Sequence, residues 1–446
     1  MPKRERVVFD FVGRAELLEA INEMTAVHQS SNSGDARPVL VVEGCGGSGR
    51  SALLAEVRER LHAQAPTVLV HPPTITPPPR AAPAAASAGV DSSVRRLLAA
   101  IMLGLSEKVA GYDLKFERVL LAHIAINAGI DGTMDAERAK IQLREATNNY
   151  RDPGLLQGLI GNLAQSVGAL ASNLPAPGGV ITPALIQTIA DQMVKRFQTS
   201  RWFTQLKWSQ EALLWFGERS QGLHLDPEAA RVRLCLQASS SDRAVRRDVD
   251  ELLVAALLAD LRHSLKTTRN RPLNVLVLID EGDGPAATTF IRALLRTRQA
   301  IATRNSTDRR IADPLTVVTA SNGTLGTHLT ASFGAPSRTG TWHRMPVGNL
   351  HLHEVVQLAR DDDSWSPRTT AAAVGASTYR LTRGHAATTA FVLNALHEEE
   401  RLAEHLDTLL RRSSPSRASR RTSSSCPDSS KGSSRPNRTP PSRSSH

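Results

Sequence analysis

The chain has 446 residues, of which 41% are hydrophobic, and its formal net charge is +11. This length predicts roughly two or three domains with a sizeable core, and three widely spaced cysteines argue against a disulfide framework and fit a reducing cytoplasm. No apolar run approaches the length of a membrane span and no apolar signal segment opens the sequence, so we expect a soluble, cytoplasmic protein without a membrane partner.

Short apolar runs alternate with amphipathic segments along the chain. The apolar runs predict strands at 38–43, 67–70, 274–280 and 314–320, with a short edge strand at 343–347. Apolar residues at helical spacing predict helices after the first strand, from about 91 to 171 with breaks, at 201–220 and 226–240, and at 241–265, 285–303, 351–363 and 384–410. Strands that alternate with helices predict an α/β fold with a parallel five-stranded sheet between helices.

A glycine-rich segment follows the first predicted strand. Residues 44–51 read GCGGSGRS, which fits the phosphate-loop pattern G-x-x-x-x-G-K-[ST] except that Arg50 stands in place of lysine. Glycines let consecutive backbone N–H groups surround phosphate oxygens, and the start of the following helix adds positive potential. The alternative is a glycine-rich turn without a ligand. The candidate nucleotide-binding residues are Gly44, Gly46, Gly47, Ser48, Gly49, Arg50 and Ser51.

Arg50 bears on hydrolysis more than on binding. Its guanidinium pairs well with phosphate oxygens, but it is bulkier than an ammonium group and is not equivalent to lysine at a crowded site. We therefore predict phosphate binding and leave turnover open, with Arg50 as a candidate catalytic residue. The Ser51 hydroxyl is a candidate ligand for Mg²⁺.

An acidic pair ends the third predicted strand, in the sequence VLVLIDEGDG at 275–284. Ligands bind at the carboxyl edge of parallel sheets, so Asp280 is placed to hold Mg²⁺ and Glu281 to polarise the attacking water. A solvated acidic turn is the alternative. The next predicted strand ends in Thr319, Ser321 and Asn322, which could present a polar side chain near the γ-phosphate.

Residues 11–21 read FVGRAELLEAI, which resembles the FVGR-x-x-EL signature of the signal-transduction (STAND) branch of AAA+-related P-loop ATPases. The resemblance implies a P-loop NTPase fold, ATP as the nucleotide, and Val12, Gly13 and Arg14 on the adenine side. It also implies that the acidic pair at 280–281 is the Walker B element and that Asn322 is the sensor at the end of the fourth strand.

The sequence LTRGHAATTAFVLNAL at 381–396 is similar to the LTGGHP-type lid of the same branch, and this implies that His385 approaches the nucleotide. Actinobacterial ATP-binding proteins with a helical insertion share further segments with this chain. Two departures stand out: Arg50 replaces the lysine, and Ala386 replaces the lid proline. About 230 residues separate the two Walker elements, and the sensor or effector repeats usual in this branch are missing, which fits a truncated chain.

These patterns divide the chain into parts of different expected roles. The parts are the two halves of a P-loop ATPase domain at 1–110 and 266–349, a helical insertion at 111–265, a helical lid at 350–410 and a basic tail at 411–446.

The tail differs in composition from the rest of the chain. It holds nine Lys or Arg and one Asp, whereas the preceding 410 residues hold 45 basic and 42 acidic residues. It cannot bury enough apolar surface to offset chain entropy, so we predict that it is disordered. It is either an out-of-frame reading that replaced a longer C-terminal domain, or a genuine basic tail that contacts nucleic acid non-specifically. No nucleic-acid partner is expected for the balanced remainder.

Three functions follow as hypotheses. The first is a regulatory switch that binds ATP and Mg²⁺ and signals to a protein partner or through self-association. Slow hydrolysis of ATP, or exchange of the nucleotide, resets this switch. The second is a pseudo-ATPase scaffold that holds the nucleotide without turnover, as Arg50 suggests. The third is a DNA-associated ATPase, which depends on the tail.

Overall fold

The computed structural model of the chain describes residues 11–25, 37–71, 93–106, 109–149, 208–219, 226–266, 274–303, 313–360 and 371–398. Five strands form one parallel sheet in the order β2-β3-β4-β1-β5, with β5 at one edge next to β1. The strands are β1 (Val39–Glu43), β2 (Thr67–Val70), β3 (Val275–Ile279), β4 (Leu315–Ser321) and β5 (Trp342–Pro346). The predicted α/β fold with a five-stranded parallel sheet between helices is confirmed.

Strand β3 is apolar at every position, and β1 is apolar up to its last residue, because both faces of the sheet are covered. Successive side chains alternate between the faces, so Val39 and Val41 join one hydrophobic cluster while Leu40 and Val42 join another. The first face carries α1 (Ala15–Thr25) and α2 (Arg50–Leu61), which bury Leu18, Leu54 and other apolar residues against the sheet.

The second face carries α3 (Ser93–Leu105), α11 (Pro285–Thr303) and α12 (Thr324–Phe333), and its cluster continues beyond them. The long helix α10 (Arg243–Lys266) packs against α11 and against α4 (Glu117–Ile126), and α4 contacts α9 (Pro227–Ala238). The same region includes α5 (Ala136–Asn149) and α8 (Gln210–Arg219). The described part of the predicted insertion is therefore mainly helical, and it shares one apolar core with the sheet.

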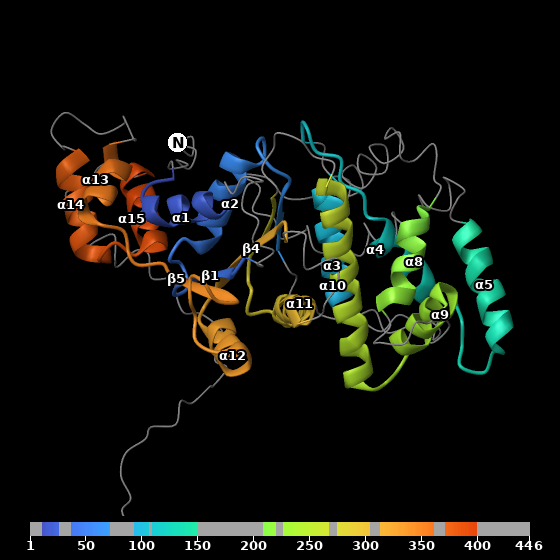
Figure 1. Cartoon of the computed structure of the whole chain (residues 1–446). Coiled ribbons are helices and arrows are strands. Elements are labelled where there is room, and N and C mark those ends of the chain that lie inside the picture. Colours follow the sequence, from blue (N-terminus) through green and yellow to red (C-terminus); the bar gives the residue numbers. More distant parts are fainter. Residues whose placement is uncertain are drawn as a thin grey trace, which may run out of the picture.

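Three further helices pack around their own small cluster, which includes Leu350, Val355 and Leu393. They are α13 (Leu352–Arg360), α14 (Ala371–Thr382) and α15 (Ala386–Glu398). In Figure 1 they lie at one end of the molecule beside α1, and α5, α8 and α9 lie at the opposite end, with the sheet between.

Three helices were not predicted from the sequence: α1, α12 and α14. The last two contain a glycine, and glycine lowers the helix propensity that the sequence pattern reports. In α14 that glycine is required by packing, because a Cβ at Gly375 would lie 2.6 Å from the Cα of Val356 in α13. Tertiary contact therefore overrides local preference here.

The predicted tail at 411–446, and the predicted lid residues 399–410, lie outside the described residues. Within the described ranges, no helix has the length and apolarity needed to cross a membrane.

Candidate functional site

The loop between β1 and α2 has the backbone of an anion-binding turn. Gly47 and Gly49 have φ values of 77° and 90°, a region that side chains other than glycine rarely adopt. Among the described residues, the N–H groups of Gly46, Gly47 and Gly49 have no hydrogen-bond partner. Together with the start of α2, these N–H groups offer donors and positive potential to an anion.

The buried Ser48 side chain adds to this loop. It is 1% exposed, and its hydroxyl has no hydrogen-bond partner in the described structure. The Ser48 N–H donates to the Cys45 carbonyl over 3.2 Å, and the Gly44 N–H donates to the carbonyl of Ser321 at the end of β4 over 3.1 Å. These bonds hold the loop against the neighbouring strand.

Ser51, in the first turn of α2, meets the end of β3. Its hydroxyl forms a hydrogen bond with the Asp280 carboxylate. The Nδ1 of His71, directly after β2, lies 3.2 Å from Oδ2 of Asp280, and the Glu281 N–H donates to Oδ1 over 3.0 Å. Burial raises the pKa of Asp280, but the hydrogen bonds with His71 and Ser51 lower it more, so its pKa lies below the ordinary value.

The other two acids of the IDEGDG turn point elsewhere. Glu281 is exposed and has a left-handed backbone with a φ of 53°. Asp283 binds the turn after β4: its carboxylate accepts from the Ser321 hydroxyl over 2.7 Å and from the Asn322 and Leu325 N–H groups over 2.6 and 2.8 Å. Asp283 therefore joins the ends of β3 and β4 and caps α12.

Of the polar residues predicted after β4, two are buried and one is exposed. Thr319 and Ser321 are 0% exposed, and the Thr319 hydroxyl lies against Gly282. Asn322 is exposed, and its side-chain oxygen accepts from the N–H and hydroxyl of Thr324, at 3.1 and 2.8 Å. Asn322 thus lies at the sheet edge with its oxygen directed to the start of α12, and its sensor role stays a prediction.

Arg14 connects the N-terminal segment with the phosphate loop. Its Nη2 donates to the Ser48 carbonyl over 3.1 Å, and its Nη1 donates to the Asn349 carbonyl over 3.4 Å. Burial lowers the pKa of Arg14, and the negative charge of Glu354 in α13 opposes this shift. The Glu354 carboxylate also lies against Gly13, so α13, the N-terminal segment and the loop meet here.

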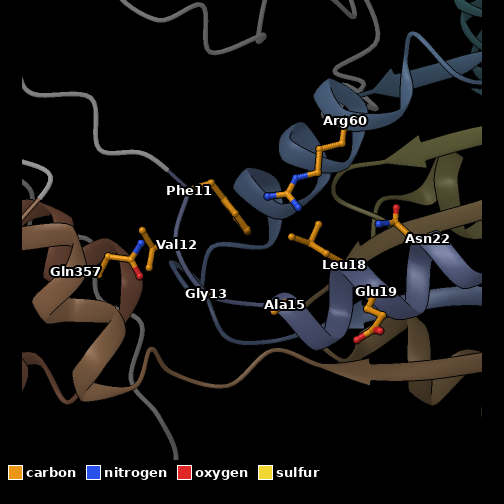
Figure 2. Close-up of a pocket in the computed structure, with 9 residues that line it drawn as sticks. All are labelled: Phe11, Val12, Gly13, Ala15, Leu18, Glu19, Asn22, Arg60 and Gln357. Carbon is orange, nitrogen blue, oxygen red and sulfur yellow. The ribbon is translucent and has the colours of Figure 1, made fainter.

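A cavity of about 400 Å³ lies beside this junction. Figure 2 shows that Phe11 from the segment before α1, Leu18 from α1 and Arg60 from α2 converge on the cavity. On its other side, Val12 lies opposite Gln357 of α13. Its volume is within the range of small-molecule sites. The remaining lining residues are Gly13, Ala15, Glu19 and Asn22. Val12 and Gly13 therefore line the cavity, whereas Arg14 is bonded to the loop.

The start of α15 docks on the outer side of the phosphate loop. Nε2 of His385 donates to the Gly46 carbonyl over 2.9 Å, and its Nδ1 accepts from the Thr388 hydroxyl over 2.8 Å. The Ala387 N–H donates to the Gly47 carbonyl over 2.9 Å. A Cβ at Gly47 would lie 2.7 Å from Cε1 of His385, so glycine is required for this contact. The lid thus uses loop carbonyls and leaves the loop N–H groups available.

Arg50 is half-buried at the start of α2 and has no hydrogen-bond or ion-pair partner among the described residues. The described non-glycine residues with positive φ are Arg14, Glu281 and Arg383. Arg14 contacts the loop, Glu281 follows Asp280, and Arg383 precedes the docked residues of α15. Such backbone conformations tend to cluster at functional sites.

The structure thus brings the predicted residues of the loop, Ser51, Asp280 and His385 together at the carboxyl edge of the sheet. Sequence reasoning missed His71, Asp283, Glu354 and Gln357. His71 could have been found as a polar residue directly after a predicted strand, and Asp283 as the third acid of the turn after β3. No local sequence pattern marks Glu354 and Gln357 of α13.

No protein-family model matches this chain, and no curated protein is significantly similar to it.

Proposed function

We propose that the chain is a P-loop ATPase of the STAND kind, which binds ATP with Mg²⁺ and acts as a nucleotide-dependent switch. The observation that carries the proposal is the contact between the Ser51 side chain and the Asp280 carboxylate, which lowers the pKa of Asp280. It joins the residue that ends the glycine-rich loop to the acid at the end of β3. A phosphate-binding loop and a magnesium-binding acid need this proximity in order to hold one Mg–nucleotide.

The topology of the sheet supports the proposal. The strand order β2-β3-β4-β1-β5 means that the chain leaves β1 for the far edge, returns to β4, and then crosses β1 to reach β5. Ligands of open α/β sheets bind outside the carboxyl ends of strands where such a reversal occurs. The loop after β1 occupies this place, and its N–H groups and the Ser48 hydroxyl, which have no partner among the described residues, would donate to a phosphate.

The residues at the loop fit Mg²⁺. Ser51 and Asp280 provide two hard oxygen ligands, and Mg²⁺ is commonly held by few protein oxygens together with phosphate oxygens and water. When bound there, Mg²⁺ neutralises charge on the β- and γ-phosphates. Arg50 adds a positive charge at the start of α2, and Glu281 is exposed at the same edge to orient a water molecule.

The cavity beside Gly13 is the proposed site of the base. Phe11, Val12 and Leu18 give it apolar walls, and Asn22 and Gln357 give it amide groups that can hydrogen-bond a purine. Gln357 belongs to α13 and His385 directly precedes α15, so the base would contact the lid directly and the phosphates would act on it through the loop. Nucleotide exchange would then shift the lid between positions and change what a protein partner or a second copy can contact.

Nucleotide binding is tested by the thermal melting of the full chain with ATP, ADP, GTP or no nucleotide, each with and without Mg²⁺. A ligand at 100 times its Kd stabilises the folded state by about 2.7 kcal/mol, so we expect a clear rise in melting temperature with ATP and Mg²⁺. The absence of a shift with every nucleotide would contradict the proposal.

Turnover is tested by the steady-state ATPase rates of the wild type, Arg50→Lys and Glu281→Gln. We expect a slow wild-type rate, because the forked guanidinium follows the γ-phosphoryl group poorly into the transition state. Lysine should raise the rate about tenfold or more, and Glu281→Gln should lower it to background because the base is lost.

Both variants should keep wild-type ATP affinity within a few-fold, which makes binding the control for turnover. Tight ATP binding with no turnover in the wild type or in Arg50→Lys would favour the pseudo-ATPase scaffold. Equal rates in all three proteins would show a contaminating activity.

A further inference from the structure

His71 is a polar side chain beside Asp280 that the P-loop pattern does not account for. It is the first residue after β2, and β2 pairs with β3 in a register that puts Val70 opposite Ile279. The Asp280 N–H donates to the Val70 carbonyl over 2.9 Å, which fixes the backbones of the two residues side by side. The relative position of His71 and Asp280 is therefore set by the sheet.

The side chains meet in a partly enclosed place. The His71 and Asp280 side chains are 14% and 11% exposed, and Nδ1 lies 3.2 Å from Oδ2. A carboxylate only accepts hydrogen bonds, so the imidazole carries its proton on Nδ1 and donates it to Oδ2. Oδ1 accepts from the Glu281 N–H over 3.0 Å. The Asp280 carboxylate is thus held at both oxygens.

The order of these groups excludes a nucleophilic triad. In such triads the imidazole stands between the serine and the carboxylate and takes the serine proton. Here the Asp280 carboxylate stands between His71 and Ser51, so His71 has no route to the Ser51 hydroxyl. The contact instead resembles the outer partners of metal ligands, which orient a ligand without touching the metal.

We propose that His71 is a positioning residue for Mg²⁺: its Nδ1–H fixes the rotation of the Asp280 carboxylate so that the carboxylate and the Ser51 hydroxyl bind one cation together. This inference rests on the proposed function. Without His71 the carboxylate can rotate about its Cβ–Cγ bond, and ordering it again on Mg²⁺ binding costs affinity. Loss of such an outer partner typically weakens metal affinity by about 10- to 100-fold.

The test compares side chains that place an N–H donor at different points. The amide nitrogen of Asn overlays Nδ1 of a histidine, whereas that of Gln overlays Nε2. ATP affinity of the full chain is measured calorimetrically in saturating Mg²⁺ and in EDTA, for wild type, His71→Asn, His71→Gln and His71→Ala. The exposed His328 on α12 provides a control, His328→Ala.

We expect Mg²⁺ to tighten ATP binding in the wild type, in His71→Asn and in the control. In His71→Gln and His71→Ala this gain should fall by about tenfold, while the affinity in EDTA stays at the wild-type value. The polar Asn and Gln variants keep the comparison valid even where alanine impairs folding.

Two results would overturn the inference while leaving the proposed function intact. One is an unchanged Mg²⁺ gain in His71→Gln, and the other is an equal loss of affinity with and without Mg²⁺, which indicates a general distortion. A wild type that binds no ATP in either condition would overturn both proposals.

Discussion

At the scale of single residues, the IDEGDG turn gives three nearby acids three different environments. Asp280 is buried and paired with Ser51 and His71, whereas Glu281 is exposed in a strained backbone conformation. Asp283 holds the turn after β4. Gly282 separates Glu281 from Asp283 and allows the close approach on which the arrangement depends.

Gly282→Ala tests that approach. A Cβ at this position would lie against the Thr319 hydroxyl and 2.9 Å from the Ala320 carbonyl oxygen, in a place where backbone must move. We expect the free energy of unfolding to fall by about 1–3 kcal/mol, measured by urea denaturation. In Gly348→Ala, the matched control, the new Cβ meets nothing within 4 Å, so its stability should match the wild type. Equal stability of the two variants would contradict the packing described here.

At the scale of elements, α4 is the most enclosed of the described helices in the predicted insertion, with α9 and α10 packed against it. It buries charged and polar groups as well as apolar ones. The Arg118 guanidinium donates to Oδ1 of Asp260 in α10 over 3.1 Å, which satisfies a charge that burial alone would disfavour. His123, in the last turn of α4, is 3% exposed, and its Nε2 has no hydrogen-bond partner among the described residues.

His123 makes stability depend on pH. Burial, and then the positive charge of Arg95, lower its pKa from 6.5 to about 4. Below pH 6.5 the unfolded chain takes up a proton that the folded chain refuses until about pH 4, so stability falls as the pH falls. Between pH 7.5 and 5 this group should remove about 2 kcal/mol of unfolding free energy.

Urea denaturation of the wild type and His123→Leu at both pH values measures this contribution. The variant should lose about 2 kcal/mol less than the wild type on acidification, since leucine takes up no proton. Replacement of the exposed His328 by leucine should leave the wild-type pH dependence unchanged. The same acid sensitivity in His123→Leu and wild type would contradict a neutral buried imidazole.

At the scale of the whole molecule, the candidate site lies between two helical regions. The residues His385 and Ala387, at the start of α15, contact the phosphate loop, and the helices α4, α5, α8, α9 and α10 extend the core on the opposite face of the sheet (Figure 1). In the proposed switch, nucleotide acts first on the predicted lid, because the loop contacts that the described residues make with these two regions come from the lid. The excess of positive charge lies away from the candidate site in the sequence, because most of it belongs to residues 411–446.

Deletion of residues 411–446 tests where the basic character acts. The full chain should bind duplex DNA at low salt, with a log–log salt slope no steeper than about −8 for its nine basic tail residues. The shortened chain should lose this binding and keep the melting shift with ATP and Mg²⁺. Undiminished, salt-sensitive DNA binding by the shortened chain would instead favour a DNA-associated ATPase.

Much of the fold could be predicted from the sequence. The apolar runs marked all five strands, including the edge strand β5 within one residue of its bounds. Runs such as VLVLI are apolar at every position only where both faces of a sheet are covered, so they predict a buried parallel strand. The helices α12 and α14 were not predicted because glycine weakens their local signal, and packing of Gly375 on Val356 decides the second.

Local sequence alone determined the glycine-rich loop, its arginine and the acid at the end of β3. Each of them belongs to a short pattern of neighbouring residues, and such a pattern can be recognised without knowledge of the rest of the fold. Only the tertiary structure decided that β2 lies beside β3 and therefore that His71 reaches Asp280. It also decided that Arg14 binds the loop while Val12 and Gly13 line the cavity. The reason is physical: strand order and helix docking depend on contacts between distant residues, which the periodicity of a single segment does not encode.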